Sequence, residues 1–333
     1  MVTEVRWHEA VKSSGEASDI SITVQDTQQR WAKSTYPQPG DKVALEIGYA
    51  GVPLVYAGQF TIDEFESRGP PFMMTLHGTE AWTTTDFLKS EKVMSFENMA
   101  VSAMAQQIAN GHGWNLITNE IEPQQDLMWD RKTQCHESDH AFLGRLAEEH
   151  GFVFSVRPPN IIFYSLAALE AQSPTGPMIT QEMVHRFSLR YQNLAEVTFL
   201  GGQHTYLNPA TKEVQVGTVE ASGDGANAVT ANSFLSSNRL ENQTQANALA
   251  AAQLHQANMY LYQGTIELPG TTIFRAGQTV ALSDEFGYFS TVGNWVIEEA
   301  EHTIRAKSVY ITRLTIRTAG PETTLIPGGA TSP

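Results

Sequence analysis

Hydrophobic and polar residues alternate in several short runs along the first 90 residues. Such alternation places successive side chains on opposite faces of a strand, and it occurs at residues 20–24, 43–47, 59–65 and 72–78. Proline and glycine residues separate the runs, as is typical of turns. Short strands joined by tight turns indicate a sandwich or barrel. Residues 1–90 are therefore predicted to form a first β-barrel domain.

The spacing of apolar residues becomes helical in the next segment, residues 91–180. Apolar side chains between positions 101 and 108 recur on one helical face, and Ser95 is predicted to cap this helix. A second helix is predicted to follow Ser138 and to end at Gly151. Short alternating runs come after it. This segment is predicted to be an α/β insert domain between two barrels.

Alternation returns in residues 181–318, which are predicted to form a second β-barrel domain. Its apolar spacing predicts a helix at 239–260. The Gly-, Asn- and Ser-rich stretch 217–237 is predicted to be an exposed loop or a flap that faces a partner. Residues 319–333 carry three prolines and three glycines. They are predicted to be a flexible C-terminal tail.

One pattern occurs twice in the chain. Gly40 opens a Val-Ala-Leu run and Gly58 opens an alternating run with an acidic end; Gly277 and Gly293 do the same in the last third. The glycines are 18 positions apart in the first copy and 16 in the second. Matched order and spacing predict an internal duplication of a small β domain. The alternative is that such short patterns are common to all antiparallel barrels.

The charge of the chain excludes some partners. The 36 acidic residues outnumber the 21 basic ones, giving a formal net charge of −15, whereas nucleic-acid binding needs clustered Lys and Arg. We therefore expect no stable nucleic-acid binding. No apolar stretch is long enough for membrane insertion, and no signal peptide is recognised, so we expect assembly in the cytoplasm. Cys135 is the only cysteine, which excludes an intrachain disulfide.

A short motif, His136-Glu137-x-x-His140, matches that of zinc proteases. In those enzymes both histidines lie on one helical turn and the Glu activates water. Here Ser138 and Asp139 are predicted to start the helix, which leaves His136 outside it. A zinc hydrolase is therefore an unfavoured alternative. We expect no catalytic residues, no metal and no cofactor.

A set of residues around this helix forms a recognisable signature: Gln134, Glu137, Ser138, Asp139, Phe142, Leu143, Arg145, Leu146, Ala147, Glu148, Glu149, Gly151 and Phe152. Further signature residues lie at 246–250, 264–270, 276–282, 293–297 and 301–304. Together they resemble the late-control D proteins of contractile phages and the hub portion of VgrG spike proteins of type VI secretion. In this family Glu-Ser-Asp starts the helix, so Ser138, Asp139 and Arg145 are expected to be structural.

The resemblance implies a tail hub that forms a trimeric ring at the end of a tail tube. Two similar barrels in each subunit would make the trimer a pseudo-hexameric ring, which adapts a six-fold tube to a three-fold spike. The implied partners are further copies of the chain (a homotrimer), the tail tube protein, the spike protein, baseplate wedge proteins and the tape-measure protein. The implied location is the tail baseplate of a virion or tailocin particle.

The chain departs from the VgrG pattern because its last matching strand ends near residue 316. We expect the spike to be a separate polypeptide, which favours a phage tail or phage-derived bacteriocin. The alternative is a VgrG-like secretion component that docks effectors through residues 319–333.

Overall fold

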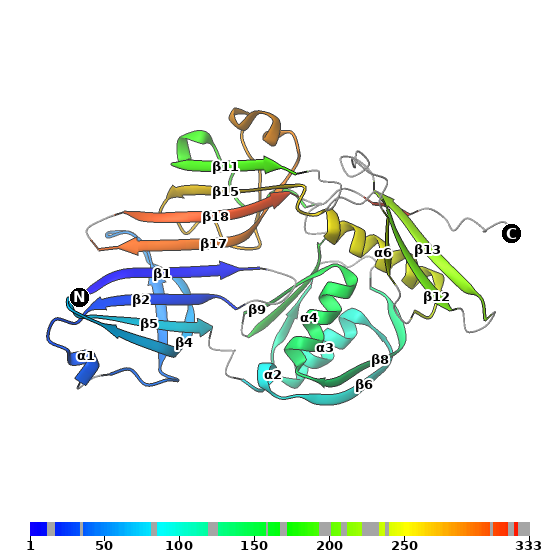
Figure 1. Ribbon diagram of the computed structural model, residues 1–333, viewed down its shortest axis with the longest axis horizontal. Helices are drawn as coiled ribbons and strands as arrows, with labels where there is room; N and C mark the ends of the chain where they lie inside the picture. Colours follow the sequence, from blue (N-terminus) through cyan, green and yellow to red (C-terminus); the bar gives the residue numbers. More distant parts are fainter. Residues whose placement is uncertain are drawn as a thin grey trace.

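The protein is mainly β, with a few helices, in the computed structural model (Figure 1). The structure describes residues 1–11, 17–33, 36–80, 85–118, 126–157, 159–166, 172–192, 201–207, 212–221, 233–236, 240–306, 309–318 and 323–325. Among the helices in these ranges, none combines the length and apolar character that a bilayer span requires.

One large antiparallel sheet dominates the described structure. Its strand order is β11-β15-β18-β17-β1-β2-β5-β4-β3, with β16 added beside β17. The first part of the chain supplies β1 (Val2–Ala10), β2 (Asp19–Gln25), β3 (Lys42–Ile47), β4 (Val55–Arg68) and β5 (Met73–Glu80), with the short helix α1 (Arg30–Lys33). The last part supplies β11 (Arg186–Tyr191), β15 (Tyr262–Pro269), β16 (Thr279–Val280), β17 (Trp295–Arg305) and β18 (Tyr310–Thr318), with the 3-10 turns η2 (Gln181–Met183) and η4 (Asp284–Ser290).

The first and last parts of the chain share this sheet because β1 pairs with β17. The pairing runs from Glu4 opposite Arg305 to Ala10 opposite Glu299, and β1 pairs with β2 along its other edge. Two separate closed barrels were predicted, but the pairing of the described strands closes no barrel. One edge of β1 pairs with β2 from the first part of the chain, and the other edge pairs with β17 from the last part.

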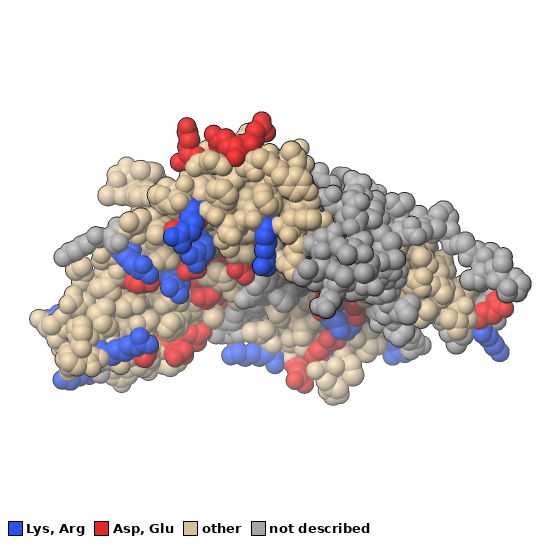
Figure 2. Space-filling model, turned by 45° about the horizontal axis from the view of Figure 1, so that its top comes forward, with Lys and Arg blue, Asp and Glu red and all other residues tan. Residues whose placement is uncertain are grey.

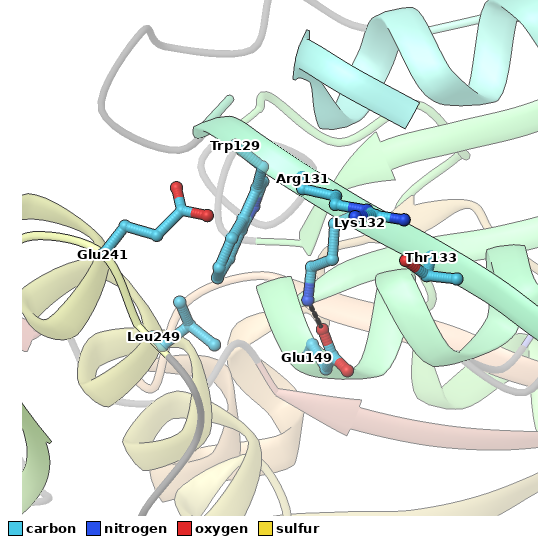
Figure 3. A pocket seen from close by; sticks show the side chains of 7 residues that line it. All are labelled: Trp129, Arg131, Lys132, Thr133, Glu149, Glu241 and Leu249. Carbon is cyan, nitrogen blue, oxygen red and sulfur yellow. Dashed lines mark hydrogen bonds and ion pairs between the residues drawn. The ribbon is translucent and has the colours of Figure 1, made fainter. Parts of the chain in front are cut away.

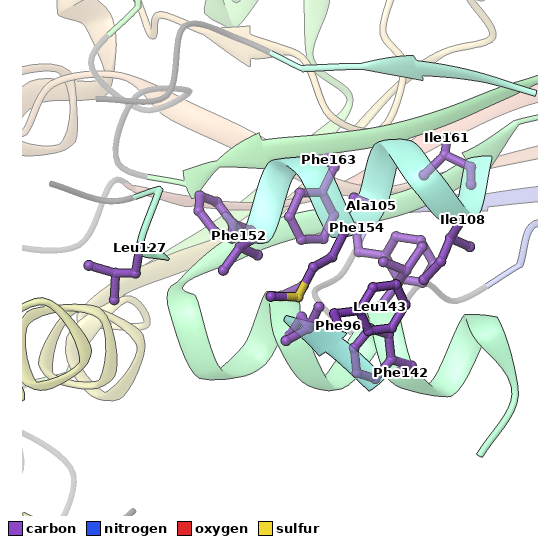
Figure 4. Close-up of a cluster of buried hydrophobic side chains, with 14 of the residues drawn as sticks. Phe96, Ala105, Ile108, Leu127, Phe142, Leu143, Phe152, Phe154, Ile161 and Phe163 are labelled. Atoms are coloured by element: carbon purple, nitrogen blue, oxygen red, sulfur yellow. The ribbon is translucent and has the colours of Figure 1, made fainter. Parts of the chain in front are cut away.

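The middle of the chain forms the α/β insert, which lies beside the large sheet in Figure 1. Its elements are α2 (Asp86–Lys89), β6 (Lys92–Ala100), α3 (Val101–Gly111), β7 (Asn115–Ile117), β8 (Met128–Glu137), α4 (Asp139–His150), β9 (Phe152–Arg157) and β10 (Asn160–Ser165). Phenylalanines from β6, α4, β9 and β10 gather against α3 to form its core (Figure 4). Burial of each such side chain stabilises the folded state by about 1.5–3 kcal/mol.

The predicted cap of the first insert helix is wrong. Ser95 lies inside β6, and α3 begins at Val101 with Ala100 in the cap position. The reason is tertiary: residues from Lys92 to Ala100 pair with β8, so the chain stays extended up to the apolar helical stripe.

A third group of elements follows β11. The strands β12 (Gly201–Leu207), β13 (Val214–Ala221), β14 (Ser233–Ser236) and β19 (Thr323–Leu325) form a four-stranded sheet beside α6 (Gln243–Asn258). The helix predicted at 239–260 is thus present and shorter, and Asn242 caps it by accepting a hydrogen bond from the Gln245 amide at 2.9 Å.

Two predictions about flexible segments need correction in this sheet. The predicted loop 217–237 is partly strand, because β13 continues to Ala221 and β14 occupies Ser233–Ser236; residues 222–232 and 237 lie outside the described residues. The predicted flexible tail contains β19, whose backbone pairs with the open edge of β13. The rest of the tail lies outside the described residues, and the domain limits at 90, 180 and 318 stay predictions.

Candidate functional site

The duplicated pattern forms two equivalent corners at the sheet. In the first, the Gly40 amide donates to the Ile62 carbonyl at 2.8 Å, and the Ile62 amide donates to the residue after the glycine at 2.8 Å. In the second, the Gly277 amide donates to the Ile297 carbonyl at 2.8 Å, and the Ile297 amide donates to the carbonyl of Gln278, the residue after the glycine, at 2.9 Å. The sequence pattern therefore encodes one backbone motif twice.

All four predicted turn glycines have a positive φ. The angle is 100° at Gly40, 151° at Gly58, 89° at Gly277 and 96° at Gly293. Residues with a Cβ adopt this region only with strain, which is the reason that glycine occupies these turns. The glycines have no chemical role in the described structure: they set the direction in which the strands leave each corner.

The equivalence extends to whole units of five strands. When the five strands of each unit are numbered in chain order, their order across the sheet is 1-2-5-4-3. This order is β1-β2-β5-β4-β3 in the first unit and β11-β15-β18-β17-β16 in the second. The fourth strand of each unit carries one extra residue at the same place, Asp63 in β4 and Glu298 in β17. Bulges are built-in features that bend a strand. We call these the first unit and the second unit.

The contact between the units is a buried cluster that sequence reasoning missed. Trp7 of β1 stacks on His302 of β17 with ring centroids 4.6 Å apart, and both rings are fully buried. Glu9 accepts two hydrogen bonds from the Arg275 guanidinium, at 2.6 and 2.7 Å. That guanidinium lies 4.7 Å from the Trp7 ring centroid, and Arg157 of the insert lies 3.9 Å from Glu9. The cluster ties three parts of the chain together.

Burial sets the charge state of this cluster. It lowers the pKa of His302 to about 4, and the opposing effect of Glu9 is smaller. His302 is therefore neutral near pH 7, and its Nδ1 lies 3.1 Å from both the Tyr310 and Thr312 hydroxyls. Burial also raises the pKa of Tyr310 to about 12. Charge in the cluster is confined to the Glu9–Arg275 pair and Arg157.

The start of α4 carries the other predicted residues. Ser138 is its N-cap and accepts a hydrogen bond from the Ala141 amide at 3.2 Å, while Gly151 ends the helix in the left-handed conformation. Both ends of this helix are where the sequence predicted them. A side-chain cap of this kind contributes about 1 kcal/mol.

Asp139 is the buried anion of the helix start. Its carboxylate accepts hydrogen bonds from Lys92 Nζ at 2.5 Å and Gln134 Nε2 at 2.9 Å, and lies 2.6 Å from His112 Nε2. Burial by itself would raise the pKa of Asp139, but the hydrogen bonds from these three side chains hold it below its usual value. Asp139 therefore joins β6, α3 and β8 to the N-terminus of α4.

Arg145 performs the corresponding role six residues later in α4. Its guanidinium donates to both oxygens of Glu137, at 2.5 and 3.2 Å, and to Glu149 at 3.1 Å. A further bond reaches the Thr133 carbonyl at 3.2 Å. Bidentate guanidinium–carboxylate pairs stabilise a contact and also fix the relative orientation of the two groups. Arg145 thus holds the end of β8 against α4.

The zinc-like motif does not form a zinc-site geometry. His136 is exposed in β8 with a φ of 53°, and α4 begins after both His136 and Glu137. Glu137 is paired with Arg145, while the His140 ring packs 5.2 Å from that of Phe154. Across the residues that the structure describes, no group of three His, Cys, Asp or Glu side chains is arranged to hold a metal.

A cavity of about 450 Å³ lies between β8, α4 and α6 (Figure 3). Lys132 dominates it, 2.5 Å from Glu149 and 4.1 Å from the Trp129 ring centroid. The neighbouring His150 ends a helix, where a positive charge is usually favoured. Burial, and secondarily Lys132, instead lowers the pKa of His150 to about 3. The cavity thus lies where the insert meets α6, and the lysine and glutamate that line it are paired with each other.

On the surface, acidic and basic side chains lie close together over much of the described face in Figure 2, and an acidic group stands at its upper edge. Ion pairs such as Arg6–Glu301 at 3.0 Å and Arg313–Glu267 at 3.3 Å join partly exposed basic and acidic side chains.

The sequence of the chain is similar to that of a known protein family and of two phage proteins. The family described as phage tail baseplate hub (GPD) matches residues 82–308. The probable baseplate hub protein of Escherichia phage 186 is 29% identical over 174 residues, and that of Escherichia phage P2 is 30% identical over 175 residues. Each match covers 51% of this chain and 42% of the relative, so less than half of either relative is matched.

Solved structures of tail proteins share the fold. The 43 kDa tail protein of prophage MuSo2 from Shewanella oneidensis has a TM-score of 0.66 at 11% identity, covering 95% of this chain and 93% of that one. A tail protein from Neisseria meningitidis MC58 gives 0.65 at 11%, covering 95% and 92%. An Escherichia coli component of the type VI secretion system gives 0.52 at 14%, covering 98% and 77%. The family match spans most of the chain, and the chain belongs to the phage tail baseplate hub (GPD) family.

Proposed function

We propose that this protein is the structural central hub of the baseplate in a contractile phage tail or tailocin. Membership of the hub family supports this role. The observation that carries it furthest is the internal repeat: two five-stranded units with the same strand order, corner hydrogen bonds and bulge stand side by side in one sheet. A chain with two equivalent units is suited to a ring with twice as many units as subunits.

The proposed assembly is a homotrimer. Three chains with two units each would present six similar units, each contributing to a small barrel in a pseudo-hexameric ring. Repeated contacts at an interface are satisfied only when the symmetries match, so such a ring would fit a six-fold tail tube on one side and a three-fold spike on the other. The proposed neighbours are the tail tube protein, the spike protein, baseplate wedge proteins and the tape-measure protein.

The proposed role is mechanical and not enzymatic. Support comes from the charged groups singled out above, which are committed to structural contacts: Asp139 and Arg145 hold α4, and Glu9 holds Arg275 across the two units. The proposed location of the protein is then the tail baseplate of the particle.

The test is the solution mass by light scattering, measured for the chain alone and with its candidate spike. The expected result is about three times 36.7 kDa, alone or on adding the spike. A trimer only in the presence of spike would mean that the spike templates assembly. A dimer, or a monomer in both conditions, would refute the proposed ring.

A further inference from the structure

The contact between the two units uses specific strands of each. It pairs the first strand of the first unit, β1, with the fourth strand of the second unit, β17. The counterparts of these strands are β11 and β4. Among the described strands β11 pairs only with β15, and the last residues of β4 pair on one side only, with β5. Each chain thus contains one contact of this kind, between β1 and β17. The equivalent edges of β11 and of the last residues of β4 have no described strand beside them.

We propose that β11 of one chain pairs antiparallel with the second half of β4 in a neighbouring copy, which repeats the β1–β17 contact between subunits. The inference rests on the proposed trimer and adds the surface and register that build it. Each chain offers one edge of each kind. Such a head-to-tail contact produces a closed ring when its rotation closes.

The register follows from the repeat. Counting from the bulge, Ser67 of β4 is the counterpart of His302 in β17. Counting across the second strand of each unit, Leu189 of β11 is the counterpart of Trp7 in β1. Because Trp7 lies opposite His302, Leu189 of one chain is assigned opposite Ser67 of the next.

Burial differs between the contact that is made and the edges that are free. At the made contact, Trp7, Ala300 and His302 are fully buried. On the free edges, Phe65 of β4 is 38% exposed and Tyr191 of β11 is 43% exposed, although the register sets them opposite each other. An uncovered strand edge with apolar side chains favours pairing with another chain. The new contact would bury these two rings together.

Charge at the two edges is complementary in the same register. Arg190 of β11 falls opposite Glu66 of β4. Glu66 is the counterpart of Glu301, which at the made contact lies opposite His8 of β1 and binds the diagonal neighbour Arg6 at 3.0 Å. In the single chain Glu66 is exposed and lies 2.8 Å from Arg68. Opposite charges directly across two strands favour pairing, so the acidic position serves both contacts.

Cysteine cross-linking tests the register. In a Cys135→Ser background, Leu189→Cys and Ser67→Cys are combined in one chain and mildly oxidised, alone and with the candidate spike. Residues directly opposite lie about 4.5–5.5 Å apart between Cα atoms, within reach of a disulfide. We expect covalent dimers and trimers on a non-reducing gel. The control combines Leu189→Cys with Arg68→Cys, which a one-residue offset places on opposite faces, and is expected to stay uncross-linked.

Charge exchange tests the same surface without cysteines. Arg190→Glu and Glu66→Arg are each expected to weaken self-association by about 2- to 5-fold per contact, and the double exchange is expected to restore it. Glu97→Arg, exposed on β6 away from both edges, is the control and should change nothing. A trimeric mass without specific cross-linking or charge rescue would overturn this pairing and leave the proposed ring standing. A monomer in every condition would overturn both.

Discussion

Removal of the Glu9 carboxylate tests whether the contact between the two units stabilises the whole chain. Glu9 lies on β1, its side chain is 3% exposed, and it accepts both bonds of the Arg275 guanidinium from the other unit. The change Glu9→Ala leaves Arg275 beside Trp7 without its carboxylate.

The size of the effect follows from the burial of each partner. Breaking a fully buried ion pair by removing one side costs about 3–5 kcal/mol, because the other charge stays buried and uncompensated. The Arg275 side chain is 25% exposed, so water relieves part of this penalty. We therefore expect the free energy of unfolding to fall by about 2–4 kcal/mol. Adding Arg275→Met should recover part of the loss, since the charge that then remains beside the site is that of Arg157, whose side chain is 32% exposed.

The assay is urea unfolding followed by circular dichroism, with stability compared through the midpoint at unchanged slope. The matched control is Glu4→Ala on the same strand. Glu4 pairs with Arg305 of β17 at 3.2 Å, but the side chains are 32% and 55% exposed, so the expected loss is about 0–1 kcal/mol. Equal small losses for Glu9→Ala and Glu4→Ala would refute the reasoning that burial makes this contact strong.

Three further predictions concern the residues that the sequence singled out. Asp139→Asn should lower stability at pH 7 by about 1.5–3 kcal/mol, because charge-assisted hydrogen bonds are lost. The pKa of Asp139 is held below its usual value, so the stability that its carboxylate contributes is present above the normal aspartate pKa and is lost as the pH falls through the folded pKa. Urea midpoints of the original protein and of Asp139→Asn should therefore converge between pH 7 and pH 3. A constant difference between the two would contradict this. Gly40→Ala should cost about 1–3 kcal/mol of stability at its φ of 100°, whereas Gly111→Ala, at the end of α3 with open space around its Cβ, should change thermal stability by less than about 1 kcal/mol; equal effects would rule out backbone strain as the cause. Metal analysis of the purified chain should find no stoichiometric zinc, and one zinc per chain that disappears with His136→Ala and His140→Ala would restore the hydrolase alternative.

Features set by local chemistry were predictable from the sequence. Ser138 and Gly151 mark the ends of α4 because a side-chain cap and a left-handed turn depend only on residues close in the chain. The two glycine corners were found for the same reason: Gly40 and Gly277 occupy conformations that favour glycine. In both cases the sequence contains the physical cause within a few positions.

Features set by distant partners were not predictable. Glu9 and Arg275 are 266 positions apart, and neither stands in a pattern that indicates a pair. Ser95 looked like a helix cap because serine favours that position, but its strand is fixed by hydrogen bonds to β8. The shared sheet also escaped prediction, since alternation shows that a strand exists and not which strand lies beside it.

The two units differ where they are not held by the repeated backbone bonds. Between β3 and β4 the connection exposes apolar side chains, with Val52 and Leu54 more than half exposed. The matching connection between β16 and β17 instead carries η4, whose first turn is acidic with Asp284 and Glu285. A ring built from both units would repeat six times in its sheet, because the corners and bulges match, and only three times at these connections. If the proposed ring forms, the matched backbone bonding would supply its six-fold part, and the side chains that differ between the two units would supply its three-fold part.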